Sequence, residues 1–106
     1  MEGKLLYIGS LTTNVEPVLQ VTNGGKAIIT SIRIVAPTNN NGTYEIHHVR
    51  RGETAANTTN AIAFNVQVDS KKAIEFLTHP FPVSPGESLW ISGSNVCMAI
   101  YGVTYP

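Results

Sequence analysis

The sequence predicts an all-β fold, a single-domain antiparallel β-sandwich of about eight short strands. Val, Ile and Thr supply 31 of the 106 residues, and β-branched side chains fit a pleated sheet better than a helix. Gly, Pro and Asn recur at short intervals between runs of strand-forming residues, a spacing typical of a sandwich or barrel. The strand order is not encoded in this pattern, so jelly-roll and Ig-like arrangements both remain open.

Four predicted strands lie in the first half of the chain. The third of them has the strongest alternation, which places Ile28, Thr30, Ile32 and Ile34 on one face. Pro17 assigns the second strand to an edge, because proline has no N–H to donate to a neighbour. These strands cover residues 5–11, 15–21, 26–35 and 44–51.

Four more strands are predicted in the second half, over residues 61–68, 72–78, 88–92 and 96–105. The fifth strand alternates cleanly and places Ile62, Phe64, Val66 and Val68 on one side. The last two strands are predicted to form a hairpin about the turn at residues 93–95. Phe81, between two prolines, is expected on a stiff extended loop.

Length and charge exclude several classes of protein. A chain of 106 residues is one domain, here residues 1–106. With a formal net charge of zero and 13% charged residues, it lacks the cationic cluster that a nucleic-acid partner requires. No apolar run approaches the roughly 20 residues that span a bilayer, and no signal peptide is visible, so we expect synthesis in the cytoplasm and no membrane partner.

No catalytic, cofactor or metal site is expected. His47 and His48 are adjacent on a predicted strand, so their side chains point to opposite faces and do not share one ion. Cys97 lies in an apolar run and is expected to be a buried, inert thiol. Asp69 is the only aspartate, and no two carboxylates are spaced for acid–base chemistry. The sequence therefore predicts a protein that is not an enzyme.

Aromatic and arginine side chains are the candidates for contacts with other proteins. Trp90 points away from its apolar strand neighbours, and a tyrosine or tryptophan on the outer face of a sheet is a favoured interface anchor. The alternative, that loops cover this face and make it core, stays open. An arginine pair suits an acidic partner surface. The simpler alternative for this pair, a solvated strand end, also stays open. The candidates are Trp90, Tyr101, Tyr105, Phe81, Arg50 and Arg51.

Two segments resemble small virion proteins of tailed bacteriophages. One is residues 25–35, GKAIITSIRIV, and the other is residues 85–93, PGESLWISG, followed by a closing strand through YGVT at residues 101–104. In that family a strand of the form A-x-I-x-S-I-x-I precedes P-G-(D/E)-x-L and a last strand ending near G-V. The resemblance spans roughly residues 4–105, and its motifs are strands and turns without catalytic signatures.

The resemblance implies a structural protein of the virion, most simply a capsid cement or decoration protein on the capsid surface. Its expected partners are the major capsid protein and further copies of itself, as a homotrimer. A tail, neck or fibre component is an alternative. A second alternative is a carbohydrate-binding module for host recognition, with the loops at residues 38–43 and 52–60 and Trp90 or a tyrosine as stacking platform.

Overall fold

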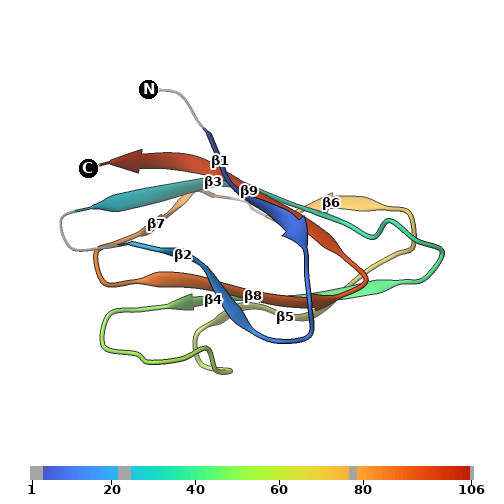
Figure 1. Ribbon diagram of the computed structural model, residues 1–106, viewed down its shortest axis with the longest axis horizontal. Coiled ribbons are helices and arrows are strands. Elements are labelled where there is room, and N and C mark those ends of the chain that lie inside the picture. Colours follow the sequence, from blue (N-terminus) through green and yellow to red (C-terminus); the bar gives the residue numbers. More distant parts are fainter. Residues whose placement is uncertain (1–3, 22–24, 77–78, 106) are drawn as a thin grey trace.

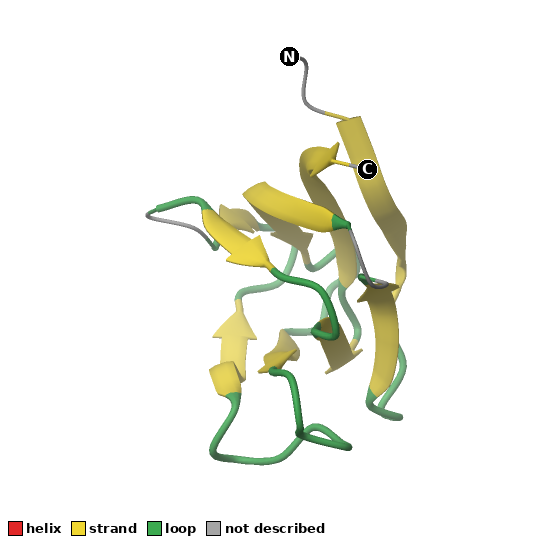
Figure 2. Cartoon of the chain, turned by 90° about the vertical axis from the view of Figure 1, so that its left-hand side faces the viewer, coloured by secondary structure: helices red, strands yellow, loops and turns green. Residues whose placement is uncertain are grey.

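The computed structural model describes residues 4–21, 25–76 and 79–105, and every regular element in them is a β-strand. Two antiparallel sheets pack face to face in two layers (Figures 1 and 2), which confirms the predicted all-β sandwich. Within these residues no helix is long and apolar enough to cross a membrane. The nine strands are β1 (Lys4–Ser10), β2 (Glu16–Gln20), β3 (Lys26–Val35), β4 (Gly42–Val49), β5 (Ala61–Val68), β6 (Ala73–Glu75), β7 (Phe81–Val83), β8 (Ser88–Ser94) and β9 (Cys97–Tyr105).

The strand order is that of a jelly roll. Sheet A has the order β1-β9-β3-β6, and sheet B has the order β2-β8-β4-β5. The short strand β7 also belongs to sheet A, where it pairs with residues 27–29 of β3 while β6 pairs with residues 33–35. Because β9 occupies the other side of β3, β6 and β7 are two halves of one strand position. Eight positions result, four in each sheet, as in a jelly roll.

The predicted hairpin of the last two strands is wrong. β8 pairs with β2 and β4 in sheet B, whereas β9 pairs with β1 and β3 in sheet A. Asn95, at φ 60°, turns the chain from one sheet to the other, and Val96 enters the space between them at 3% exposure. Turn residues specify that a chain reverses, but they do not specify whether the next strand returns to the same sheet.

The core lies between the two sheets and is built from both. Ile32 and Ile100 come from sheet A, and Ile46 and Leu89 come from sheet B, all at 0% exposure. Burial of such side chains is the main favourable term in folding. The other large, fully buried members are Ile29, Ile34, Tyr44, Val68, Val83 and Met98.

Two β-bulges change which side chains face this core. In β3 the register shifts between Ile29 and Ser31, so Ile28 points outward and does not share a face with Ile32 and Ile34 as predicted. In β5 the shift comes with Asn65 at φ 52°, so Phe64 is 53% exposed while Val66 and Val68 pack inward. Ile62 is also exposed, at 39%. An extra residue on one strand reverses the alternation beyond it.

Candidate functional site

The outer side of sheet A carries an apolar surface, here called the apolar face. Leu5 and Ile8 of β1 are 48% and 65% exposed, and Tyr101 and Tyr105 of β9 are 39% and 37% exposed. Strand register aligns Leu5 with Tyr101 and Ile8 with Ala99, and cross-strand neighbours on one face are in contact distance. The members are Leu5, Ile8, Ile28, Ala99, Tyr101, Val103 and Tyr105.

Few charges interrupt this face. Arg33 is paired with Glu75 at 3.0 Å, and the Lys26 ammonium lies 5.2 Å from the centre of the Tyr105 ring. Cys97 is half-buried at the end of β9, where its sulfur lies 3.4 Å from the Ser10 hydroxyl, so the thiol is less buried than expected. A largely uncharged sheet face loses little hydration free energy when another protein covers it.

The predicted interface residues do not form one surface. Tyr101 and Tyr105 share the apolar face as predicted. Trp90 lies half-buried on the outer side of sheet B, where its indole N–H donates to the Ser88 hydroxyl at 2.8 Å. Phe81 is in β7, not in a loop, and packs half-buried against the core.

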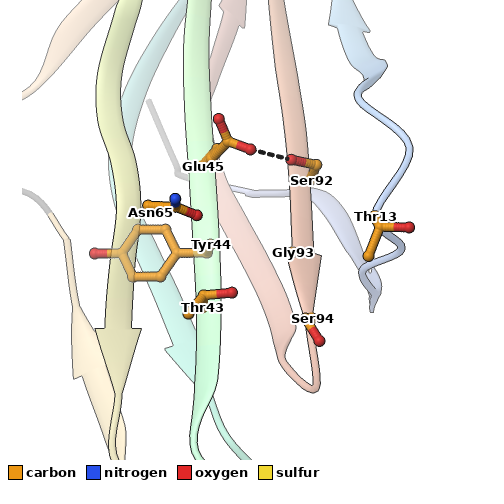
Figure 3. A pocket seen from close by; sticks show the side chains of 8 residues that line it. All are labelled: Thr13, Thr43, Tyr44, Glu45, Asn65, Ser92, Gly93 and Ser94. Atoms are coloured by element: carbon orange, nitrogen blue, oxygen red, sulfur yellow. Dashed lines mark hydrogen bonds between the residues drawn. The ribbon is translucent and has the colours of Figure 1, made fainter.

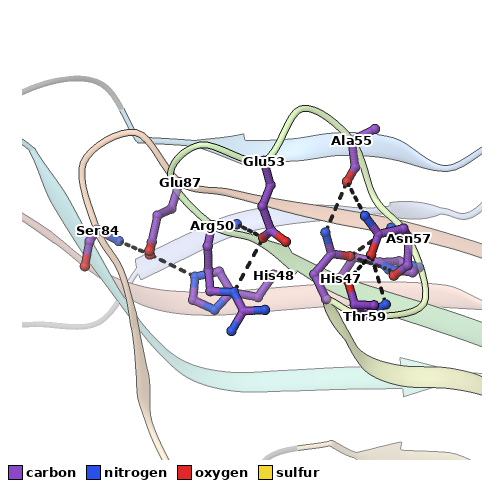
Figure 4. A network of polar contacts seen from close by, with 10 residues as sticks. His47, His48, Arg50, Glu53, Ala55, Asn57, Thr59, Ser84 and Glu87 are labelled. Atoms are coloured by element: carbon purple, nitrogen blue, oxygen red, sulfur yellow. Dashed lines mark hydrogen bonds and ion pairs between the residues drawn. The ribbon is translucent and has the colours of Figure 1, made fainter.

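Arg50 and Arg51 begin the long loop that follows β4, and both are exposed. The Arg50 backbone N–H donates to the Glu53 carboxylate at 2.7 Å, and its side chain lies 3.4 Å from the same oxygen (Figure 4). These contacts lower the pKa of Glu53, the backbone hydrogen bond most of all. Arg50 is therefore engaged within its own loop.

A buried histidine attaches this loop to sheet B (Figure 4). His47 Nδ1 lies 2.9 Å from the Asn57 carbonyl and 3.1 Å from Asn60 Oδ1. The Asn60 amide is itself oriented, because its Nδ2 donates to the Ala55 carbonyl and its Oδ1 accepts the Asn57 N–H. Two acceptors therefore face Nδ1, so this nitrogen carries the proton.

Beside His47, a polar hollow of about 110 Å³ opens on the outer side of sheet B (Figure 3). The Ser92 hydroxyl donates to Glu45 at 3.1 Å, and the other Glu45 oxygen lies 3.6 Å from His47 Nε2. His47 Nε2 is buried and has no hydrogen-bond partner among the described residues. The lining is rich in hydroxyl groups and consists of Thr13, Thr43, Tyr44, Glu45, Asn65, Ser92, Gly93 and Ser94.

This order of contacts differs from that of a nucleophilic triad. A triad requires a histidine between the serine and the carboxylate, but here Glu45 lies between Ser92 and His47. The Ser92 hydroxyl donates to a carboxylate and is not hydrogen-bonded to a histidine base. Among the described residues, no group of three or more His, Cys, Asp or Glu is placed to hold a metal ion.

His48 points to the other side of β4, as the adjacent pair predicts. Its Nε2 lies 2.9 Å from the Glu87 carboxylate, which also accepts the Ser84 backbone N–H at 2.8 Å. Burial raises the pKa of Glu87, but Ser84, His48 and Arg50 together outweigh it, so the pKa lies below the ordinary value of 4.5. His48 and Glu87 thus join β4 to the turn before β8.

Sequence reasoning missed Leu5 and Ile8 as surface residues. Their strand was predicted without an assigned face, because residues 5–8 form a continuous apolar run with no alternation. In the structure a bulge lies between Leu5 and Tyr7. Sequence reasoning also missed the network of His47, Asn57 and Asn60, which depends on how the loop folds back. Comparisons with protein-family models, with curated proteins and with solved structures find no match to this chain.

Proposed function

We propose that this chain is a non-enzymatic structural protein of a virion, a capsid cement protein that stabilises the head by bridging major capsid subunits. The observation that carries the proposal is the apolar face, where Leu5, Ile8, Tyr101 and Tyr105 are exposed together on one sheet. Monomeric soluble proteins rarely leave a large contiguous apolar patch uncovered, and such patches mark protein contacts. The phage-like strand motifs point to the same kind of partner.

The edge strands of both sheets favour contact with another protein through the face of a sheet and not through its edge. β1 and β5 are interrupted by bulges, β2 contains Pro17 and a further shift, and β6 has three residues. Bulges, proline and short length are the devices that prevent edge-to-edge pairing with another chain. Adhesion is thereby directed to the broad surfaces of the sandwich.

The proposed mechanism is thermodynamic linkage between binding of this protein and assembly of the shell. A protein that binds the assembled shell more tightly than free capsid subunits stabilises the shell by the difference in binding free energy. No bond needs to be made or broken. The protein would act at the capsid surface after synthesis in the host cytoplasm.

Purified particles of the phage that encodes this chain test the proposal. We expect hundreds of copies per particle, and we expect particles stripped of the protein to lose heat resistance that the added wild-type protein restores. Particles that lack the chain, or whose heat resistance is unchanged by stripping, would contradict it. A few to dozens of copies would instead place the chain in the tail, neck or a fibre.

A second candidate function, carbohydrate binding, is favoured by the polar hollow beside Glu45. Its hydroxyl, amide and carboxylate groups suit a hydroxyl-rich ligand, and the jelly roll is used by lectins as well as by capsid proteins, which is a fold-level analogy only. Trp90, which was considered as a stacking platform for a sugar, is half-buried, and its indole N–H already donates to Ser88, so this N–H is not free to bind a ligand. A glycan array on which wild type binds and Glu45→Gln does not would favour this function; an array without binding would exclude it.

A further inference from the structure

His47 belongs to the outer side of sheet B, yet it is only 3% exposed, and the loop at residues 50–60 is attached to it. Its Nδ1 faces the Asn57 carbonyl and the Asn60 side-chain oxygen at 2.9 and 3.1 Å (Figure 4). Because Nδ1 carries the proton, the other ring nitrogen, Nε2, has a lone pair. This lone pair is buried without a hydrogen-bond partner among the described residues, which costs free energy.

The group nearest to this lone pair is a second acceptor. Glu45 lies two residues earlier on the same face of β4, and one of its carboxylate oxygens is 3.6 Å from Nε2. The other Glu45 oxygen accepts the Ser92 hydroxyl proton at 3.1 Å (Figure 3). A carboxylate and a nitrogen lone pair have no proton to share, so the contact is unfavourable as it stands. One added proton converts it into a charge-assisted hydrogen bond.

The histidine is the group that takes this proton, because an imidazole is ordinarily more basic than a carboxylate. Both ring nitrogens of His47 then donate, Nδ1 to the loop and Nε2 to Glu45. A charge-assisted contact of this kind is about 2.7–2.9 Å long, so the 3.6 Å gap has to shorten by roughly 0.8 Å. Glu45 is the partner that moves, since its side chain is 23% exposed whereas His47 is held at Nδ1.

The strands on either side of β4 bring no further charge to this pair. β5 and β8 are the neighbours of β4, and neither contains an ionisable residue. The loop contributes Arg50, Arg51 and Glu53, of which Arg50 and Glu53 contact each other. His48 points to the opposite side of β4, where it contacts Glu87. The neighbouring charges therefore have partners of their own or lie in the loop.

We propose that His47 and Glu45 form a pH-sensitive switch, in which protonation of His47 closes the contact with Glu45 and holds the loop at residues 50–60 more firmly on sheet B. Histidine is the side chain whose ordinary charge change falls between pH 5 and 8. By linkage, the stabilisation is present on the acid side of the histidine titration and is lost as the pH rises through it. The switch concerns the loop alone and does not depend on the proposed function.

Nitrogen-15 NMR of the imidazole rings measures the protonation state of the wild-type chain. Between about pH 7.5 and about pH 5.5 the side chains that titrate are the three histidines, since carboxylates ordinarily titrate at lower pH. We expect His47 to carry a proton on Nδ1 alone at the upper pH and on both nitrogens at the lower pH. A His47 ring that stays neutral at the lower pH overturns the proposal.

Amide exchange in residues 53–59 measures how firmly the loop is held. After correction for the intrinsic pH dependence of exchange, protection should rise about tenfold between the two pH values, as a gained charged hydrogen bond implies. Glu45→Gln should abolish this response and keep protection high at both pH values, because its carboxamide N–H can donate to the neutral Nε2. Glu45→Ala, which offers neither a charge nor a donor, should leave protection low at both.

Two further variants are matched controls. Glu16→Gln removes an exposed carboxylate of β2, and His48→Gln removes the histidine on the opposite side of β4. Both should keep the wild-type response. Equal protection of the wild-type loop at the two pH values overturns the switch, and so does a response that survives Glu45→Gln or Glu45→Ala. A response that disappears in His48→Gln would belong to the other histidine and would also overturn it.

Discussion

The imidazole of His48 lies 2.9 Å from the carboxylate of Glu87 and joins β4 to the turn that precedes β8. The two side chains are 20% and 17% exposed, so water screens the pair less than it screens a surface ion pair. The same carboxylate accepts the Ser84 N–H. This carboxylate is therefore held in its charged form by groups from two different segments.

Acidification should remove this stabilisation. Because the pKa of Glu87 in the folded protein lies below the ordinary 4.5, its contribution is present above pH 4.5 and is lost as the pH falls through the folded value. Glu87→Gln should lower the free energy of unfolding at pH 7 by on the order of 1 kcal/mol. Urea unfolding of both proteins at pH 7 and pH 3 should show the difference shrinking in acid. The exposed Glu75→Gln is the control, and an unchanged difference at both pH values would refute the assignment.

Gly102 should not tolerate a side chain. A Cβ at this position would overlap the Ile28 carbonyl oxygen, which is backbone, and would lie 2.9 Å from the Leu6 side chain. Gly102→Ala should therefore cost about 1–3 kcal/mol, measured by urea unfolding. Gly9→Ala is the matched control, because the nearest atom there is the hydroxyl at the end of the Tyr7 side chain. Equal stability of the two variants would contradict the packing of β9 against β3.

Asn60 should be the residue that attaches the loop to sheet B. Asn60→Ala removes the bonds to Ala55 and Asn57 and leaves His47 Nδ1 with one acceptor fewer. A loss of about 2 kcal/mol in unfolding free energy is expected, with faster amide exchange in residues 53–59. Asn39→Ala, exposed in another loop, should change neither. Unchanged exchange in the Asn60 variant would show that the network does not hold the loop.

The stability of the protein should depend on which residue occupies the bulge position Asn65 in β5. Asn65 has φ 52°, a conformation that costs a glycine almost nothing and a β-branched residue much more. Asn65→Gly should be neutral or slightly stabilising, whereas Asn65→Val should lower the thermal midpoint by several degrees. Gln67→Val, two positions along the same strand, is the control for hydrophobic substitution. If Asn65→Val were as stable as wild type, the bulge would have to lie elsewhere.

The sequence was most informative where structure is local. Tyr101 and Tyr105 were predicted to share a face because the alternation in β9 is unbroken, and His47 and His48 were placed on opposite sides for the same reason. Phe64 was assigned wrongly because one inserted residue, Asn65, reverses the alternation, and a bulge leaves no distinct pattern in composition.

Long-range pairing was not predictable. The residues of β8 and β9 are as compatible with a hairpin as with strands in two different sheets. Only the competition among all strands for partners places them in different sheets. The apolar face follows from that pairing, because Leu5 and Tyr101 are 96 positions apart and meet only when β1 lies beside β9. The network around His47 depends likewise on how residues 50–60 fold back over sheet B.

The position of β9 in sheet A also constrains how the chain is made. On the ribosome β1 and β3 emerge early, yet each has β9 as its neighbour, and β9 is synthesised after every other strand of the sheet. Until it arrives, two strands of that sheet keep unpaired backbone edges and exposed isoleucines, the condition that favours aggregation. Insertion of this strand between them closes the sheet in a single late event, so we expect folding to be completed only after β9 has left the ribosome.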